Sequence, residues 1–299
     1  MTAPVELLIP IALGLAYYRR VAHLRERGRA PSKLRQASFG LGLALIAAVT
    51  VGPVDGLADD FVWGHMVQHT VLTDEAALFL AIGLTGPILR PILALPVLTH
   101  LRALAYPGVA LGLWILVIYA WHAPALYQAA EEHPLLHLLE HACFLGAGLF
   151  MWLALLGPLP KPQWFGHAAK VGYTAVVHFS SMGMANILMW SGTVLYPIYE
   201  SSEGAHGISP LTDQSIAGAI LMIQGGVIML GVFFWILLQW AREDTERQEL
   251  LDLAERIGVP LSESRASRAV AAGRGSELRE RLEAEAGGRG SEGPAPVPG

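Results

Sequence analysis

Residues 214–240 read QSIAGAILMIQGGVIMLGVFFWILLQW and contain no charged side chain. About 20 consecutive apolar residues cross the hydrocarbon core of a bilayer as a helix, so this stretch predicts a transmembrane helix. The composition of the 299-residue chain agrees, because 53% of its residues are hydrophobic and only 15% are charged. Ordinary soluble domains contain about 25% charged residues. The composition therefore argues against a soluble enzyme and against a disordered protein.

Six further apolar runs complete a predicted all-α bundle of seven transmembrane helices. The seven runs cover residues 5–18, 36–51, 62–84, 104–121, 134–156, 171–190 and 214–240. The first run is short for a span. It lacks the basic start and the small-residue cleavage site of a signal peptide, so we expect it to remain as an anchor.

The lysines and arginines of the chain predict its orientation in the membrane. The first loop carries seven of them, the third and fifth loops carry two each, and the segment after Trp240 carries the remaining nine. The second, fourth and sixth loops carry only acidic charges. Because basic loops stay in the cytoplasm, we expect the N-terminus outside and the C-terminus in the cytoplasm of a multi-pass protein of the bacterial inner membrane.

The residues after the last run differ in composition from the rest of the chain. We expect two parts, a seven-helix transmembrane domain over residues 1–241 and a charged cytoplasmic tail over residues 242–299. The tail has mixed charge and ends in a stretch rich in glycine and proline, so we expect it to be largely disordered.

The single cysteine and the distribution of basic residues exclude two further classes of site. Cys143 has no second thiol with which to form an intramolecular disulfide or a CxxC motif. No basic aromatic stripe or zinc-finger spacing occurs, so we expect no nucleic-acid partner. The partners that we expect are the membrane lipid and other membrane proteins.

Seven of the eleven histidines lie in or beside predicted spans, and six of those belong to the predicted outer half of the membrane. They are His65, His69, His122, His133, His137 and His141, with His178 deeper in the sixth run. Imidazole pairs four residues apart lie on one helical face, and polar groups within a bilayer usually face the bundle interior. The pattern predicts a metal site, although histidines bonded across helices to hydroxyl and backbone groups would give the same pattern.

The ligand types favour a soft metal. Imidazole with thioether favours Cu(I), and imidazole alone also suits zinc, iron or haem. Met182 shares a helical face with His178 and is expected at about the depth of His69 and His141, so it is the candidate thioether. Glu140 lies close enough to His137 in sequence to hold one of its ring nitrogens.

Asp74 and Glu75 lie near the middle of the third run. A carboxylate at the centre of a membrane predicts proton movement or a charge partner. The alternative is that one carboxyl is protonated and the other caps a local break in the helix.

Three motifs resemble the CtaG-type cytochrome c oxidase assembly factors, a bacterial family of polytopic membrane proteins. They are GHMVQH at 64–69, WHAPALY at 121–127 with HLLEH at 137–141, and DQSIAGAILM at 213–222. The resemblance covers about residues 35–240. It implies help in installing copper in a haem-copper oxidase, with His65, His69, His122, His137 and His141 as metal residues and an accessory role for Asp213 and Gln214. The chain departs from the family pattern at TDEAA, residues 73–77, where members often carry apolar residues and prolines.

We therefore expect a membrane-embedded assembly factor that binds copper near the outer membrane face and delivers it to subunits of cytochrome c oxidase. No nucleophile or acid–base pair with substrate geometry is evident, so we do not expect an enzyme. The alternative from the residues is a haem-binding or proton-linked oxidoreductase or transporter, because histidines on facing helices can ligate haem and Asp74 and Glu75 could carry protons.

Overall fold

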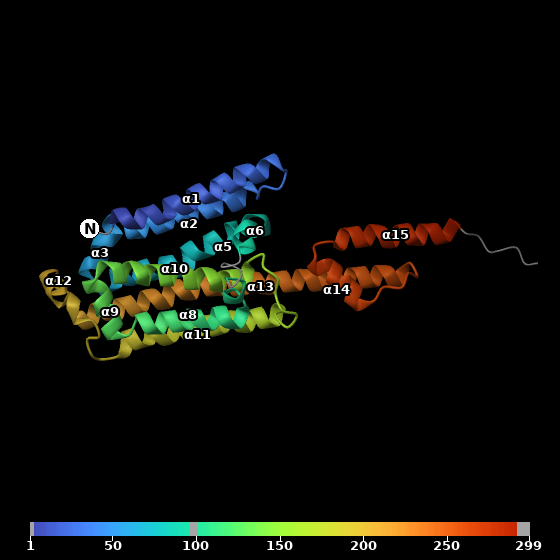
Figure 1. The fold of residues 1–299 in the computed structure, drawn as a ribbon. Helices are drawn as coiled ribbons and strands as arrows, with labels where there is room; N and C mark the ends of the chain where they lie inside the picture. Colours follow the sequence, from blue (N-terminus) through green and yellow to red (C-terminus); the bar gives the residue numbers. More distant parts are fainter. Residues whose placement is uncertain (1–2, 96–100, 292–299) are drawn as a thin grey trace, which may run out of the picture. The chain divides into compact units, whose positions relative to one another are not determined.

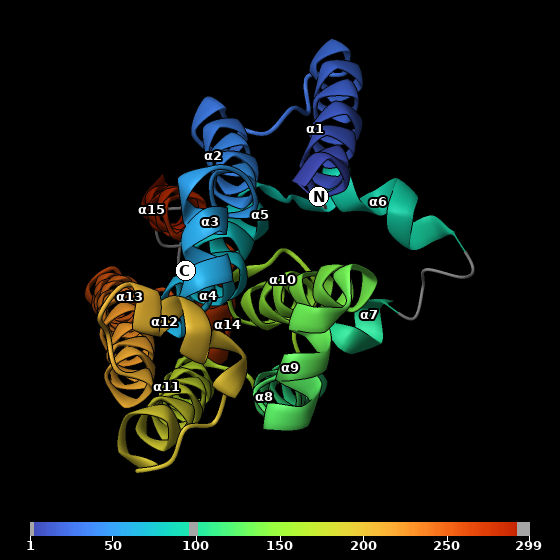
Figure 2. The ribbon, with the colours of Figure 1, turned by 90° about the vertical axis from the view of Figure 1, so that its left-hand side faces the viewer.

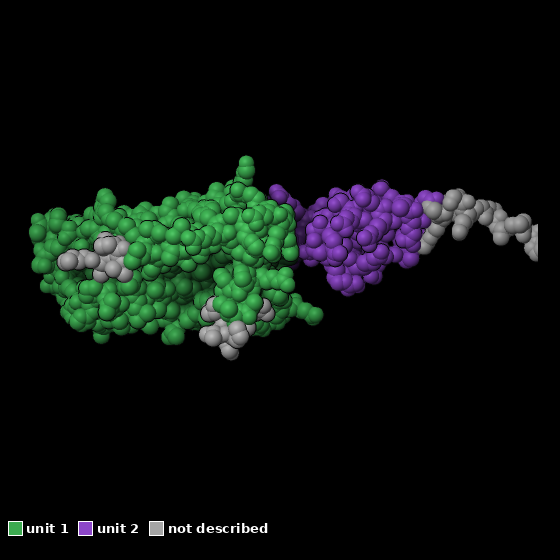
Figure 3. Space-filling view, turned by 45° about the horizontal axis from the view of Figure 1, so that its top comes forward, with its two compact units in different colours: residues 1–231 green, residues 232–299 purple. Residues whose placement is uncertain are grey.

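The computed structural model of the chain describes residues 3–95 and 101–291, and every regular element in these two ranges is a helix. The chain divides into two compact units, residues 1–231 and 232–299 (Figure 3). The all-helical class expected from the sequence is confirmed.

Unit 1 is a bundle of long helices, and short helices lie between them at one end (Figures 1 and 2). The elements that begin in it are α1 (Ala3–Glu26), α2 (Lys33–Thr50), α3 (Pro53–Asp60), α4 (Val62–Thr70), a π-helical segment (Val71–Ala76), α5 (Ala77–Gly83), α6 (Gly86–Ala94), α7 (Leu101–Leu104), α8 (Pro107–Trp121), α9 (Pro124–Glu132), α10 (Pro134–Leu156), α11 (His167–Trp190), a 3-10 segment (Pro197–Tyr199), α12 (Glu200–Ala205) and α13 (Pro210–Arg256).

Two helices, α10 and α13, are each long and apolar enough to cross a membrane. Three bent pairs pass the same test of length and composition when each pair is taken together, which allows up to five spans in the described residues. The pairs are α2 with α3, the segment Val62–Gly83 with α6, and α8 with α9, bent by 47°, 95° and 73°. The count of seven spans and the orientation of the termini stay predictions.

The outer face of α13 supports a membrane environment. Ile223, Val227 and Leu230 lie three or four residues apart on this helix and are 66%, 68% and 56% exposed. An apolar stripe of this kind would be a liability in water, whereas lipid tails solvate it at no cost.

The helices that carry the histidines approach closely because glycines lie at their contacts. A Cβ on Gly148 of α10 would clash with the backbone carbonyl of Thr73 in the π-helical segment, and a Cβ on Gly64 of α4 would clash with the carbonyl of Leu57 in α3. Phe144 and Trp152 of α10 are fully buried. The third run thus packs against α10 through the π-helical segment and α5.

Unit 2 is helical and has a core of its own. It contains the part of α13 after residue 231, α14 (Glu263–Ala271) and α15 (Gly275–Ser291). Leu250, Val259, Val270 and Leu282 pack together in it, and the Ser262 hydroxyl accepts the Arg265 N–H at the start of α14. The sequence predicts mostly disorder over residues 242–299, whereas the structure places helices over most of this range. Residues 292–299 lie outside the described residues, and the division at residue 241 stays a prediction.

Candidate metal centre

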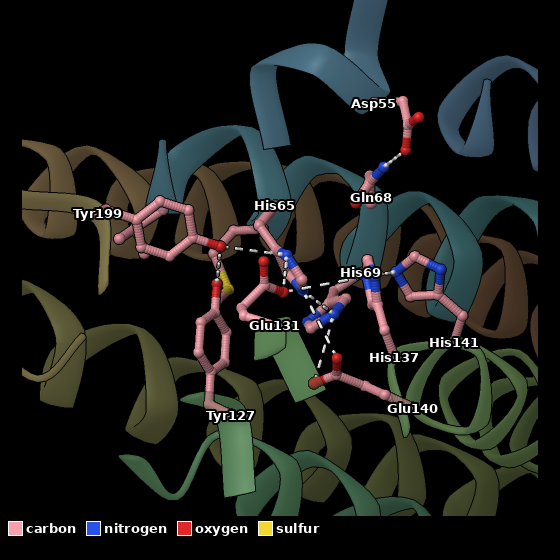
Figure 4. Close-up of polar contacts among 12 residues, drawn as sticks. Asp55, His65, Gln68, His69, Tyr127, Glu131, His137, Glu140, His141 and Tyr199 are labelled. Atoms are coloured by element: carbon pink, nitrogen blue, oxygen red, sulfur yellow. Dashed lines mark hydrogen bonds and ion pairs between the residues drawn. The ribbon is translucent and has the colours of Figure 1, made fainter. Parts of the chain in front are cut away.

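Four of the predicted histidines meet between α4 and α10. His65 and His69 lie one turn apart on α4, and their Nε2 atoms are 2.6 Å apart. His137 and His141 repeat this spacing on α10, with 3.1 Å between their Nε2 atoms. The ring of His65 lies 5.2 Å from that of His137, and the ring of His69 lies 5.7 Å from that of His141 (Figure 4).

Two carboxylates enter the same cluster. The Glu131 carboxylate, from the last turn of α9, lies 2.9 Å from Nδ1 of His65 and 4.0 Å from Nε2 of His137. The Glu140 carboxylate, from α10, lies 3.7 Å from Nε2 of both His65 and His69. His65 and Glu140 have no exposed surface, so the charge of Glu140 is shielded from water.

Glu131 influences which nitrogen of the His65 ring carries a proton. Its carboxylate lies 2.9 Å from Nδ1 of His65, and the negative charge there favours a proton on that nitrogen. The lone pair of His65 then lies on Nε2, which faces the other imidazoles. Carboxylates orient metal-binding histidines in this way in many metal sites.

Tyrosines close the side of the cluster near His65. The hydroxyl of Tyr199 lies 3.4 Å from Nδ1 of His65 and 3.2 Å from the hydroxyl of Tyr127 (Figure 4). Burial, together with the nearby charge of Glu131, raises the pKa of Tyr199 well above its ordinary value. The phenol therefore stays neutral and can still donate its proton.

His122 lies beside the cluster with a sulfur atom as its neighbour. Its Nδ1 donates to the carbonyl of Ile118 in the preceding turn of α8, at 2.8 Å. Its Nε2 lies 3.3 Å from Sδ of Met66, and its ring is 5.7 Å from that of His69. An imidazole nitrogen and a thioether, both soft donors, therefore lie together at the edge of the cluster.

Two residues at the start of α13 hold this end of the bundle together. The carboxylate of Asp213 accepts the backbone N–H groups of Val62 and Trp63, at 2.7 and 3.1 Å, and so caps the first turn of α4. The Gln214 side chain donates to the carbonyl of Leu188 and accepts the N–H of Leu195. The family resemblance implies an accessory role for Asp213 and Gln214, and these contacts offer a structural form of it, which is to hold neighbouring elements together.

The donor atoms are close enough to share one ion. The ligand atoms of His65, His137 and His141 all lie within 4.8 Å of one another, and so do those of His65, Glu131, His137 and Glu140. Nδ1 of His69 is buried without a hydrogen-bond partner, so this ring has a second nitrogen on which a proton can rest when Nε2 binds an ion. The residues therefore fit a metal bound by imidazole with carboxylate nearby.

Three of the predicted site residues are not brought into this cluster. His133 is exposed at the start of α10. His178 contacts the ring of Phe179 on α11, and Met182 is half-buried one turn further along that helix. In the described part of the chain none of the three makes a hydrogen bond, ion pair or ring contact with the four clustered histidines.

Asp74 and Glu75 lie in the π-helical segment, away from the imidazoles. Gln224 of α13 donates to Glu75 at 2.5 Å and accepts from the hydroxyl of Thr70 at 2.8 Å. Asp74 is 7% exposed, and its Oδ1 has no hydrogen-bond partner. Within the described residues neither carboxyl has a cationic partner.

Two residues of the cluster, Glu131 and Met66, are not among the residues predicted from the sequence. Glu131 belongs to a predicted external loop, and the predicted thioether is Met182. A signal for each existed. Met66 lies within the motif at 64–69, and Glu131 lies six residues before His137 across a Pro-containing helix boundary.

Comparison with known proteins places these residues in a described family. Residues 15–243 match the family described as "Cytochrome c oxidase caa3 assembly factor (Caa3_CtaG)". Uncharacterized proteins of Mycobacterium bovis and Mycobacterium tuberculosis are each 23% identical to the chain over 253 residues, which cover 78% of this chain and 38% of theirs. The chain thus spans less than half the length of these curated relatives. No solved structure matches the chain. The family match extends over most of the chain and includes all four clustered histidines, and the chain belongs to the family of cytochrome c oxidase caa3 assembly factors.

Proposed function

We propose that this assembly factor binds copper between α4 and α10 and delivers it to subunits of cytochrome c oxidase in the bacterial inner membrane. His65, His69, His137 and His141 are the ligand candidates. Glu131 orients His65, and Glu140 supplies negative charge to balance the cation. The proposal makes the copper ion a cargo of the protein and assigns no catalytic step.

The observation that carries the proposal is the convergence of four imidazoles and two carboxylates inside a bundle. Polar groups at this depth cost free energy unless they are paired or used. Within each helical pair the Nε2 atoms of the imidazoles face one another, which supports a role beyond hydrogen bonding to hydroxyl and backbone groups. The two carboxylates in contact with the histidines bring negative charge that would favour a bound cation.

The arrangement suits a metal that must leave again. Cu(I) accepts two or three soft ligands, and the four imidazoles offer several alternative pairs at similar distances. The pair of His122 and Met66 lies beside them and provides a further position with one nitrogen and one sulfur donor. Exchange between such positions would let an ion move without being fully released to water.

The close packing of the imidazoles favours an ion over haem. The Nε2 atoms within each helical pair are 2.6 and 3.1 Å apart, and the rings of His65 and His137 are 5.2 Å apart. A porphyrin plane between these rings would require α4 and α10 to move apart.

Metal analysis of the purified protein tests the binding step. We expect about one copper ion per chain, and we expect the double variant H137Q/H141Q to lose it because two of the four donors are removed. The matched control is H133Q/H178Q, which removes two histidines that lie outside the cluster and should retain the ion.

Three results would contradict the binding step. Equal copper content in the two double variants would show that the clustered histidines do not hold the metal. Zinc bound in place of copper would show that the site holds a different metal, and a Soret band in the membrane extract would favour haem. The delivery step is tested separately, because cells with H137Q/H141Q should contain cytochrome c oxidase depleted of copper although the variant is inserted in the membrane.

A further inference from the structure

A basic cavity lies at the other end of unit 1 from the histidines. It has a volume of about 670 Å³ and lies between the end of α1, α6 and residues 158–160. Arg20, Arg27, Arg29 and Arg90 line it, and the remaining lining residues are apolar or glycine. Among the described residues no acidic side chain lines the cavity, and the four arginines give it positive charge.

Three of these four arginines are available to a ligand. Arg20 donates to the carbonyl of Pro87 through Nε and Nη2, which fixes its guanidinium against the start of α6. Across the described ranges the side chains of Arg27, Arg29 and Arg90 form no hydrogen bond or ion pair, and all three are exposed. Each offers a planar set of donors that matches two oxygens of a phosphate.

The course of α6 favours a position of this cavity at a membrane surface. The chain turns by 95° between Val62–Gly83 and α6, so α6 runs across the bundle axis instead of along it (Figure 2). Ile88 and Leu93 are buried against the bundle, whereas Ile92 and Leu95 are 41% and 53% exposed. A helix that lies across a bundle end and shows apolar side chains beside an arginine is typical of the bilayer interface.

We propose that this cavity binds the phosphate headgroup of an anionic phospholipid. The phosphate would be held by Arg27, Arg29 and Arg90 with Arg20 behind them, and the acyl chains would follow the apolar side chains of α6 into the bilayer. Basic pockets between helices at the cytoplasmic side of a membrane bind such headgroups in other proteins. Because this site shares no residue with the histidine cluster, the proposal is independent of the metal proposal.

The test is native mass spectrometry of the protein in an uncharged detergent with added phosphatidylglycerol or phosphatidylcholine. We expect phosphatidylglycerol to remain bound and phosphatidylcholine to be lost. The variant R27Q/R29Q/R90Q should retain phosphatidylglycerol at least about tenfold more weakly. Exposed arginines tolerate this change, and circular dichroism checks that the helices are intact.

Two further variants and one competitor make the test specific. R265Q/R268Q/R281Q in unit 2 removes the same charge outside this cavity and should leave lipid retention unchanged. R27K/R29K/R90K keeps the charge and should restore retention in part, because lysine cannot bind two oxygens of one phosphate in the arginine geometry. Equal loss in both glutamine triples, or equal retention of the two lipids, would overturn the proposal. Displacement of the lipid by inorganic phosphate would show a site for a free anion and overturn the assignment to lipid.

Discussion

Glu131 contacts one histidine of each helical pair, His65 on α4 and His137 on α10. Its carboxylate lies 2.9 Å from Nδ1 of His65 and so favours a proton on that nitrogen and the lone pair on Nε2. It is also within 4.0 Å of His137 and therefore contributes negative charge on the side where α9 meets α10. A change at Glu131 should alter the basicity of an imidazole without removing a ligand.

We expect E131Q to bind copper about 10 to 100 times more weakly than the unchanged protein. The amide keeps the shape of the side chain but loses the charge that orients and polarises His65. Competition with a copper chelator measures the change. E132Q, at the next and exposed position, is the matched control, and an equal effect of both variants would count against the role of Glu131.

Glu203 is expected to make folding stability depend on pH. It is 1% exposed in α12, and burial, with a hydrogen bond to Asp213 and the charge of Asp213, raises the pKa of Glu203 to about 7. The folded chain thus keeps a proton that the unfolded chain releases above about pH 4.5. This contribution is complete at lower pH and is lost as the pH rises through about 7.

The measurement is the thermal unfolding midpoint in detergent at about pH 5 and about pH 8. E203Q imitates the protonated form, so its midpoint should fall less between the two values than that of the unchanged protein. E200Q alters an exposed carboxyl in the same helix and should keep most of the dependence, because the charge of Glu200 is the smallest of the causes that raise the pKa of Glu203. If E203Q and the unchanged protein show the same dependence, another group controls it.

At the residue level the sequence could predict the imidazole pairs but not their partners. Histidines four residues apart share a helical face wherever the helix packs, so His65 with His69 and His137 with His141 follow from local geometry. Glu131 reaches the cluster because α9 turns by 73° after α8. Met66 joins it because α4 packs beside His122. Met182 lies at a similar predicted depth, but depth alone does not determine the direction in which a side chain points.

Among the elements, the contact between α10 and the π-helical segment controls the distance between the two histidine pairs. Gly148 allows the α10 backbone to approach the Thr73 carbonyl, and Thr73 in turn bonds the carbonyl of His69 through its hydroxyl at 2.7 Å. The separation of α4 and α10 at the metal centre therefore depends on a residue two turns away along α10.

We expect G148A to lower the thermal unfolding midpoint and weaken copper binding. A methyl group there overlaps a backbone carbonyl, which cannot rotate away, and overpacking of this kind costs about 1–3 kcal/mol. G146A is the control, since a Cβ at Gly146 meets nothing within 4 Å and alanine favours the helix. If G148A binds copper normally, the spacing of the helices does not limit the site.

The π-helical segment carries a second prediction, which concerns Asp74. A carboxyl that is 7% exposed, next to Glu75 and without a cationic partner in the described chain, is expected to hold a proton. A hydrophobic carbodiimide, which reacts with protonated carboxyls, should modify Asp74 in membranes, and D74N should abolish the modification. Each carboxylate oxygen of Asp213 accepts a backbone N–H group, so this carboxyl should not react. Modification of both residues or of neither would contradict the prediction.

The sequence shows that residues 73–77 depart from the family pattern, but it does not show which backbone structure these residues form. Apolar periodicity predicts one helix over 62–84, and a carboxylate pair within it signals only that something unusual occurs. The structure shows a π-helical turn there and a 95° turn before α6. Both depend on packing against α10 and α1, which the sequence of the run alone does not contain.

For the molecule as a whole, charge and fold agree along unit 1. The acidic loops belong to the end formed by α3, α9 and α12, and the basic turn after α1 lies with α6 at the opposite end (Figure 1). Composition was enough to predict this separation, because the positive-inside rule acts on loops and not on packing. Composition could not predict the short helices at the histidine end, or the core of unit 2, where a few leucines and valines among many charges suffice.

Cysteine accessibility tests the predicted orientation. In a C143S background, E132C at the histidine end and K33C at the basic end each give one exposed thiol. A membrane-impermeant maleimide should label E132C in spheroplasts and label K33C only after permeabilisation, because basic loops remain in the cytoplasm. The reverse pattern would place the histidines on the cytoplasmic side, where the ion would have to be taken from and returned to the cytoplasm. Labelling of both thiols in intact spheroplasts would mean that at least one predicted span does not cross the membrane. The first run, which is short for a span, would be the leading candidate.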